Sequence, residues 1–136
     1  MFPLTKDKTT MKIINATPHQ IIICSKEGVT QDPKTKQFTA ETVEALHTLP
    51  PSGIIPRVAM GNIDAEPLLG IPVQLVQYGE IEGLPDPIPD TFYVVSGLVA
   101  SAAVKVGRTD CLAPGALVRN ANNPSEVLGC LFLQKP

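Results

Sequence analysis

The residues best suited to binding chemistry in this sequence are its three arginines. Arg57, Arg108 and Arg119 each lie beside a turn signal, and none lies on an evident helix face. A planar guanidinium group binds phosphate or carboxylate through paired N–H donors, so these residues predict an anionic ligand. The alternative is that each arginine pairs with a nearby acid, as Arg108 would with Asp110.

Ser96 directly precedes a run of small apolar residues, Gly-Leu-Val-Ala-Ser-Ala-Ala-Val. Its hydroxyl can accept a hydrogen bond from an N–H group of a first helical turn, which makes it a candidate helix cap. A helix start also favours an anion, because its unpaired N–H groups and its dipole attract negative charge. A nucleophilic serine is the alternative, but no histidine and acid stand in register with Ser96.

Thr17 and His19 lie at a bend, Ala-Thr-Pro-His, between two short apolar runs. A neutral imidazole titrates near physiological pH, so His19 is a candidate general base or ligand contact. In the alternative, a lone histidine without a visible carboxylate partner is a hydrogen-bonded structural residue.

A strand followed by a helix must position Ser96. Residues 91–95 are rich in β-branched and aromatic side chains and follow three prolines, which predicts a strand. Apolar residues then recur near helical spacing up to Val106, and Gly107 is placed to end the helix. Arg108 and Asp110 follow immediately, so polar groups gather where these elements end.

The sequence pattern predicts mostly strands in the rest of the chain. Alternation and turn residues predict strands at 71–78, 116–120 and 127–133, the last two joined as a hairpin. The runs 11–15 and 20–24 predict either two strands or one strand bent by Pro18. Apolar spacing predicts a short helix at 39–49, with His47 on its surface, and a loop or short edge element at 61–70. We therefore expect an α+β fold, with a mostly antiparallel sheet and one or two short helices. A single domain over 11–136 would follow a flexible lead at 1–10, and Met11 is a candidate natural start.

Composition excludes several classes of function. The chain has 136 residues and a net charge of −2, and no lysine or arginine occurs from Val58 to Val104, so a nucleic-acid polymer is not expected as a partner. No apolar run reaches the roughly 20 residues of a membrane helix, and no secretory signal is evident. The three cysteines and two histidines have no metal-binding spacing, which predicts buried thiols, no metal and no cofactor.

A series of turn-forming motifs runs through the chain from Lys12. They are Asn15-x-Thr17-Pro18-His19, Pro51-Ser52-Gly53 with Arg57, Gly70-Ile-Pro-Val73, Gly83-Leu-Pro85, Tyr93-Val-Val-Ser96, Arg108-x-Asp110, Pro114-Gly115 with Val118-Arg119, and Gly129-Cys130. In this series the chain resembles a family of short proteins, encoded by phages and bacteria, that are usually left without an assigned function. The resemblance implies a phage-linked, single-domain protein of the host cytoplasm, and it assigns no catalytic role to any residue.

One class of phage proteins with a similar profile sequesters the nucleotide signals of bacterial immunity. The resemblance thus implies a non-catalytic, homo-oligomeric anti-defence protein that binds a phosphorylated nucleotide. The arginines and Ser96 would hold its phosphate, and Thr17, His19 and Asp110 would orient its base and sugar. Phe92 or Tyr93 could stack on the base. The alternatives are a structural or partner-binding phage protein that docks through its Pro-rich segment 83–90, and a small nucleotide hydrolase or lyase with His19 as general base.

Overall fold

The structure is a computed structural model that describes residues 11–136, so the lead expected at 1–10 lies outside the described residues. Ten strands and one helix follow one another in this range. They are β1 (Lys12–Asn15), β2 (Ile21–Cys24), β3 (Thr30–Gln31), β4 (Phe38–Ala40), β5 (Ala45–Leu49), β6 (Arg57–Leu68), β7 (Ile71–Glu82), β8 (Thr91–Val94), α1 (Gly97–Lys105), β9 (Cys111–Asn120) and β10 (Asn123–Gln134).

The expected α+β class with a mostly antiparallel sheet is wrong. Strands make up 55% of the structure and helix 7%, so the fold is mostly β. Eight strands form one mixed sheet in the order β1-β8-β9-β10-β2-β5, with β4 on β9 and β3 on β4. The pairs β1–β8, β8–β9, β4–β9 and β10–β2 are parallel. Such pairs join segments far apart in the chain, and local turn signals do not specify them.

The strand and helix expected around Ser96 are confirmed. β8 ends at Val94, and the Ser96 hydroxyl accepts a hydrogen bond from the N–H of Val99 at 3.3 Å. At the other end of α1, Gly107 has a φ of 83° and its N–H donates to the carbonyl of Val104 at 3.0 Å. A glycine adopts this left-handed conformation without the steric cost that a side chain would bring, so the helix stops where the sequence predicts.

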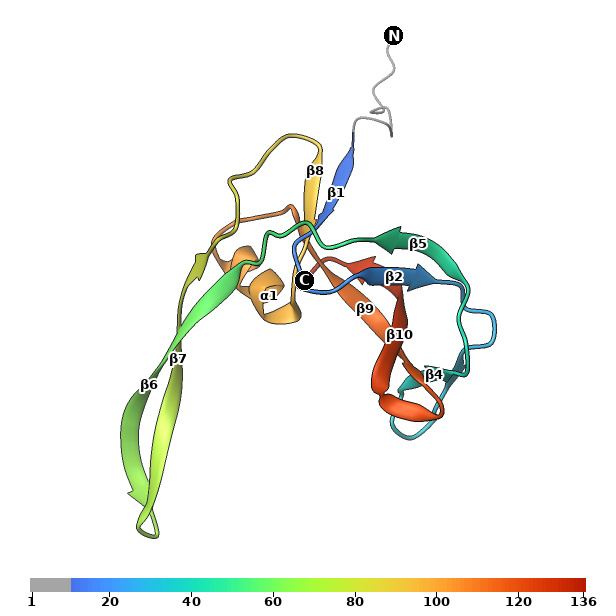
Figure 1. The fold of residues 1–136 in the computed structure, drawn as a ribbon. Helices are drawn as coiled ribbons and strands as arrows, with labels where there is room; N and C mark the ends of the chain where they lie inside the picture. Colours follow the sequence, from blue (N-terminus) through green and yellow to red (C-terminus); the bar gives the residue numbers. More distant parts are fainter. Residues whose placement is uncertain (1–10) are drawn as a thin grey trace.

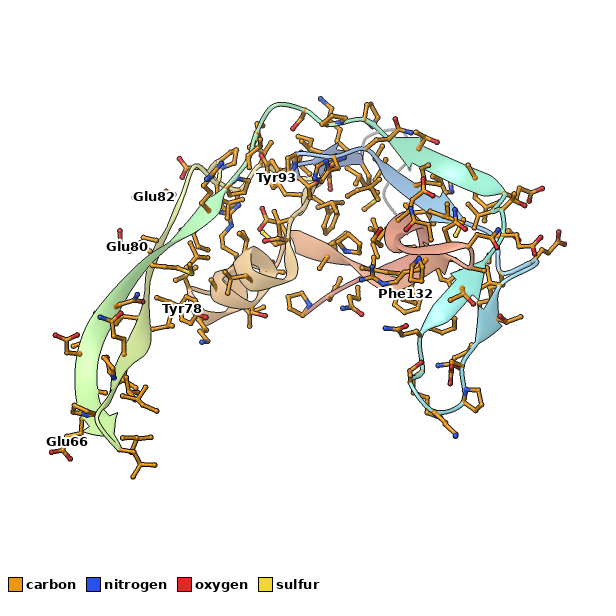
Figure 2. The ribbon with its side chains drawn as sticks, turned by 60° about the horizontal axis from the view of Figure 1, so that its bottom comes forward. Glu66, Tyr78, Glu80, Glu82, Tyr93 and Phe132 are labelled. Atoms are coloured by element: carbon orange, nitrogen blue, oxygen red, sulfur yellow. The ribbon has the colours of Figure 1, made fainter. Side chains whose placement is uncertain are left out.

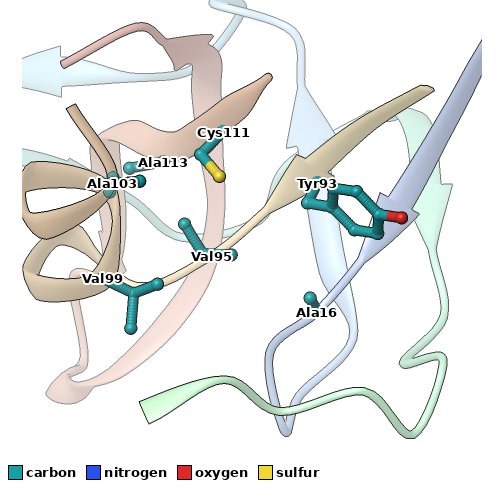
Figure 3. Close-up of a cluster of buried hydrophobic side chains, with 8 residues drawn as sticks. Ala16, Tyr93, Val95, Val99, Ala103, Cys111 and Ala113 are labelled. Atoms are coloured by element: carbon teal, nitrogen blue, oxygen red, sulfur yellow. The ribbon is translucent and has the colours of Figure 1, made fainter. Parts of the chain in front are cut away.

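Small apolar side chains pack α1 against the sheet. Val95 and Val99 are buried together with Ala103, Cys111 and Ala113, and Figure 3 shows these side chains gathered between α1 and the neighbouring strands. Their small size lets the helix approach the strands closely, and close packing of this kind leaves little room for a changed side chain. The position of Ser96 at the start of α1 is therefore held by the core.

The helix expected at 39–49 is wrong. Its first residues belong to β4, and β5 pairs antiparallel with β2, with Ile21 opposite Leu49 and Ile23 opposite His47. Leu46, which would have faced the core from a helix, is exposed. Strand pairing gives the N–H and C=O groups of β2 hydrogen-bond partners, and this tertiary gain outweighs the weak local preference for helix. His47 is exposed as expected, although it lies on a strand.

A long hairpin replaces the loop or short edge element expected at 61–70. β6 and β7 pair antiparallel over their whole length and form a separate two-stranded sheet, here called the arm (residues 57–82). Figure 1 shows the arm projecting away from the other strands. Twelve residues a strand correspond to roughly 40 Å of length. Leu69 and Gly70 turn the chain at its tip, both with positive φ, as in the tight turns of two-residue hairpins.

The three cysteines are free and buried, as expected. Burial raises the pKa of the Cys24, Cys111 and Cys130 thiols, because it disfavours the charged thiolate. We expect all three to react with iodoacetamide at pH 8 on the order of 100-fold more slowly in the folded protein than in urea, as followed by mass spectrometry. Rapid labelling of the folded chain at any of the three would contradict this placement.

Candidate functional site

A cavity of about 350 Å³ lies beside the start of α1 and is here called the Ser96 cavity. Three of the residues proposed from sequence line it, namely Thr17, His19 and Ser96. Apolar side chains from the three strands β2, β9 and β10 form much of the remaining wall: Ile21, Ile22, Leu117, Val127, Leu128 and Cys130. The cavity thus combines an apolar floor with a few polar groups, which is the usual composition of a small-molecule site.

Ser96 is positioned to interact with a ligand while it caps the helix. Its oxygen accepts from the Val99 N–H, so the hydroxyl hydrogen remains free to be donated. The N–H groups of Gly97 and Leu98, in the first turn of α1, have no carbonyl partner within the helix. Ser96 lines the cavity, whereas Gly97 and Leu98 do not, so the Ser96 hydroxyl and the dipole of α1 are what favour negative charge at this end of the cavity.

The bend that carries Thr17 and His19 is built around Asn15, a polar residue that is only 2% exposed. Its amide Nδ2 donates to the carbonyls of His19 at 2.7 Å and Leu49 at 2.8 Å. Its Oδ1 accepts from the N–H of Thr17 at 3.0 Å and from the Thr17 hydroxyl at 2.6 Å. The backbone carbonyl of Asn15 accepts from the N–H and the hydroxyl of Ser52. The first two sequence motifs are therefore held together by one hydrogen-bond network.

This network limits what Thr17 and His19 can do chemically. The Thr17 hydroxyl donates its one hydrogen inside the bend, so its oxygen faces a ligand only as an acceptor. The His19 imidazole is exposed, and no carboxylate of residues 11–136 is bonded to it. His19 can therefore contact a ligand at the cavity mouth, but the orienting acid of a catalytic triad is missing from the described geometry.

Arg108 and Asp110 lie elsewhere and bind each other. Arg108 Nε donates to Asp110 Oδ1 at 2.9 Å, and Nη2 donates to Asp110 Oδ2 at 2.8 Å and to the carbonyl of Pro85 at 2.9 Å. The hydrogen bond from Arg108 lowers the pKa of the Asp110 carboxyl, and the same bond raises the pKa of Arg108. The ion-paired alternative considered for Arg108 is thus confirmed. The pair lines a second cavity of about 460 Å³, with Phe92.

The other two arginines are separate from both cavities. Arg57 is exposed at the base of the arm, opposite Glu82 in the strand register. Arg119 lies near the end of β9, where its Nη1 donates to the carbonyl of Pro124 at 3.1 Å. Tyr93 is buried in the core at 1% exposure, so it does not offer a stacking face. Within one chain, the structure brings together Thr17, His19 and Ser96, and it does not bring the arginines to them.

Sequence reasoning missed the floor of the Ser96 cavity. Its apolar residues come from β2, β9 and β10, and β2 and β10 meet in a parallel pair with Ile23 opposite Cys130. No local pattern joins positions more than 100 residues apart. Asn15 entered the sequence analysis only as the first residue of a turn-forming motif, although the run Asn-x-Thr is a signal for local side-chain hydrogen bonding.

The described part of the chain contains no group of three or more metal-binding side chains. It also contains no helix with the length and apolar character needed to cross a membrane. No protein-family model, curated protein or solved structure matches this chain. The candidate function therefore rests on the geometry of the Ser96 cavity.

Proposed function

We propose that this protein binds a small phosphorylated ligand of the nucleotide type in the Ser96 cavity and holds it without converting it. The observation that carries this proposal is the Ser96 hydroxyl, at the start of α1, in the wall of a cavity with an apolar floor. A volume of about 350 Å³ lies within the range of small-molecule pockets. The apolar floor suits the base of a nucleotide, and the Ser96 hydroxyl and the positive end of the helix dipole suit its phosphate.

Sequestration is favoured over catalysis by the state of the polar groups. No carboxylate of the described residues is bonded to His19 to orient it as a base for Ser96, and the Thr17 hydroxyl donates its hydrogen within the bend. A phage-linked protein of the host cytoplasm that holds an immune nucleotide would need only tight binding. Arg57, Arg108 and Arg119 have no contact with the cavity in one chain, so their role in phosphate binding stays a prediction.

The first test is incubation of the purified protein with a panel of cyclic nucleotides and ADP-ribose derivatives, followed by chromatography before and after heat denaturation. We expect at least one compound to leave the solution and to return unchanged on heating. A new product would establish an enzyme instead. Panel compounds that are neither depleted nor changed would contradict the nucleotide proposal.

Two substitutions at the helix cap test the charge preference. Aspartate and asparagine both cap helices well, so Ser96→Asp and Ser96→Asn should fold equally. Only Ser96→Asp places a negative charge at the first turn, and we expect it to weaken binding of the retained nucleotide about tenfold or more in isothermal titration calorimetry. Equal affinities in the two variants would place the phosphate elsewhere.

A pair of tryptophan substitutions tests the location. Val127 lines the Ser96 cavity and is partly exposed, so Val127→Trp should fill the mouth and abolish binding without loss of the core. Leu46 on β5 is similarly exposed but lies outside the cavity, so Leu46→Trp should bind as the unchanged protein does. Identical affinities in both variants would contradict the assignment of this cavity.

A second candidate function, partner binding, is favoured by a different observation. The Pro-rich segment 83–90, which was considered as the docking element, connects β7 to β8 and lines the cavity beside Arg108. The arm instead presents the large exposed apolar surface that a docking element requires.

A further inference from the structure

The arm exposes an unusual amount of apolar surface. Eight of its large apolar side chains are between 45% and 100% exposed, and they are Met60, Ile63, Leu68, Leu69, Ile71, Leu75, Val76 and Tyr78. A two-stranded hairpin without a further covering layer is at best marginally stable in water. Contiguous apolar patches beyond a few hundred Å² mark interaction sites on soluble proteins. The exposed apolar side chains of the arm therefore indicate that another protein surface packs against it.

The tip of the arm carries the clearest sign of contact. Leu69 is 100% exposed and has a φ of 51°, a left-handed conformation that costs energy for a residue with a side chain. Asparagine or glycine would form this turn more easily and would be soluble there. Leucine forms this turn less easily than asparagine or glycine and is less soluble there. Backbone strain of this kind is typical of functional positions.

The charges of the arm distinguish it from the rest of the chain. The arm has one arginine and four carboxylates (Asp64, Glu66, Glu80 and Glu82), a net charge of −3, whereas the remainder of the chain has a net charge of +1. Figure 2 shows Glu66 near the tip and Tyr78 closer to α1. A surface that is apolar and locally basic would complement the tip.

Such a surface exists on the protein itself. A groove of about 500 Å³, here called the α1 groove, lies between α1 and the base of the arm. Its lining includes Leu98, Ala102, Lys105 and Val106 from the helix side and Val58, Tyr78 and Glu80 from the arm, so it is largely apolar and holds both a lysine and a carboxylate. Leu98 and Val106 are exposed, and Lys105 is the basic residue in the last turn of the helix.

We propose that two copies of this chain exchange arms, so that the tip of each arm lies in the α1 groove of the other copy. The face that carries Tyr78, Met60 and Val76 runs from the groove outward along the arm, and toward the tip it continues with Asn62 and the hydrogen-bonded pair of Gln74 and Asp64. Two such faces packed antiparallel about a two-fold axis bring each tip to the other copy's groove, so the contact is self-complementary. In this arrangement Lys105 meets the carboxylates near the partner's tip.

The arms supply about half of the area of a standard interface. A face roughly 40 Å long and about 10 Å wide buries on the order of 400 Å² on each arm. A standard interface buries ~800 Å² per partner, so the tip and the groove of each copy must supply a comparable additional area. The dimer does not depend on the proposed ligand, so each proposal stands or fails alone.

The test is the mass of the whole protein in solution, measured by size-exclusion chromatography with light scattering. We expect twice the 14.5 kDa of one chain. Leu69→Asn should raise the dissociation constant at least tenfold, because it removes the apolar tip while making the turn easier to form. Leu46→Asp, a change of another exposed leucine, on β5 outside the arm, should leave the dimer intact. A monomeric unchanged protein, or a dimer insensitive to Leu69→Asn, would overturn the proposal.

Two further variants test where the tip lies. Cysteines introduced together as Leu69→Cys and Val106→Cys should form a covalent dimer under mild oxidation, whereas either change alone should not. Lys105→Glu should weaken the dimer, and adding Glu66→Lys should restore it. A stable dimer without this cross-link and without this rescue would contradict the exchange of arms.

Discussion

Replacing Asn15 by aspartate should lower the free energy of unfolding by about 3 kcal/mol or more, although the two side chains have nearly the same shape. The Asn15 amide donates to the carbonyls of His19 and Leu49, and an aspartate at neutral pH has no hydrogen to donate. The change also places a buried negative charge against two carbonyl oxygens. Urea denaturation followed by circular dichroism measures the loss.

The structure provides a matched control for this substitution. Asn122 lies in the exposed turn between β9 and β10, where its N–H, and not its side chain, bonds to Asn120. Asn122→Asp should change the unfolding free energy by no more than about 0.5 kcal/mol. If Asn15→Asp were as mild as this control, the network would not hold the bend. Ligand binding gives a second measurement, because the same network places Thr17 and His19 at the Ser96 cavity.

The parts of the fold that the sequence predicted are those with local causes. Ser96 and Gly107 mark the two ends of α1 through hydrogen bonding and backbone conformation, which depend on neighbouring residues alone. The hairpin of β9 and β10 likewise follows from adjacent segments. The helix expected at 39–49 failed because β5 is stabilised by β2, a strand more than 20 residues away.

The arm was expected as a loop or short edge element at 61–70, although part of its unusual character is visible in the sequence. The absence of lysine and arginine from Val58 to Val104 was visible in the sequence, and the tight turn at Leu69-Gly70 lacks the usual Asn-Gly signal. Because leucine is not a usual turn residue, the amino-acid composition of this segment does not predict the hairpin. The candidate site shares this limit in part: the pairing of Arg108 with Asp110 is local and was anticipated, whereas the Pro85 carbonyl beside Arg108 and the floor beside Ser96 come from distant segments.

The pairing of Arg108 with Asp110 predicts a second large effect on stability. Arg108→Ala should lower the free energy of unfolding by about 2–3 kcal/mol at pH 7, because it leaves a mostly buried carboxylate and the Pro85 carbonyl without their donor. Arg119 is a matched control, since it makes one exposed hydrogen bond to a carbonyl. Arg119→Ala should cost less than about 1 kcal/mol. Equal losses in the two variants would show that the ion pair does not stabilise the fold.

The pH dependence of stability separates the ion pair from simple packing. Arg108 lowers the pKa of Asp110 in the folded state, so the unfolded chain binds more protons as the pH falls. The contribution of the pair is therefore fully present above the pKa of the unfolded carboxyl, about 3.9, and is lost as the pH falls through the lower folded value. We expect the difference in unfolding free energy between the unchanged protein and Asp110→Asn to shrink from pH 6 to pH 2. A difference that stays constant over this range would assign the effect to packing, because packing does not titrate.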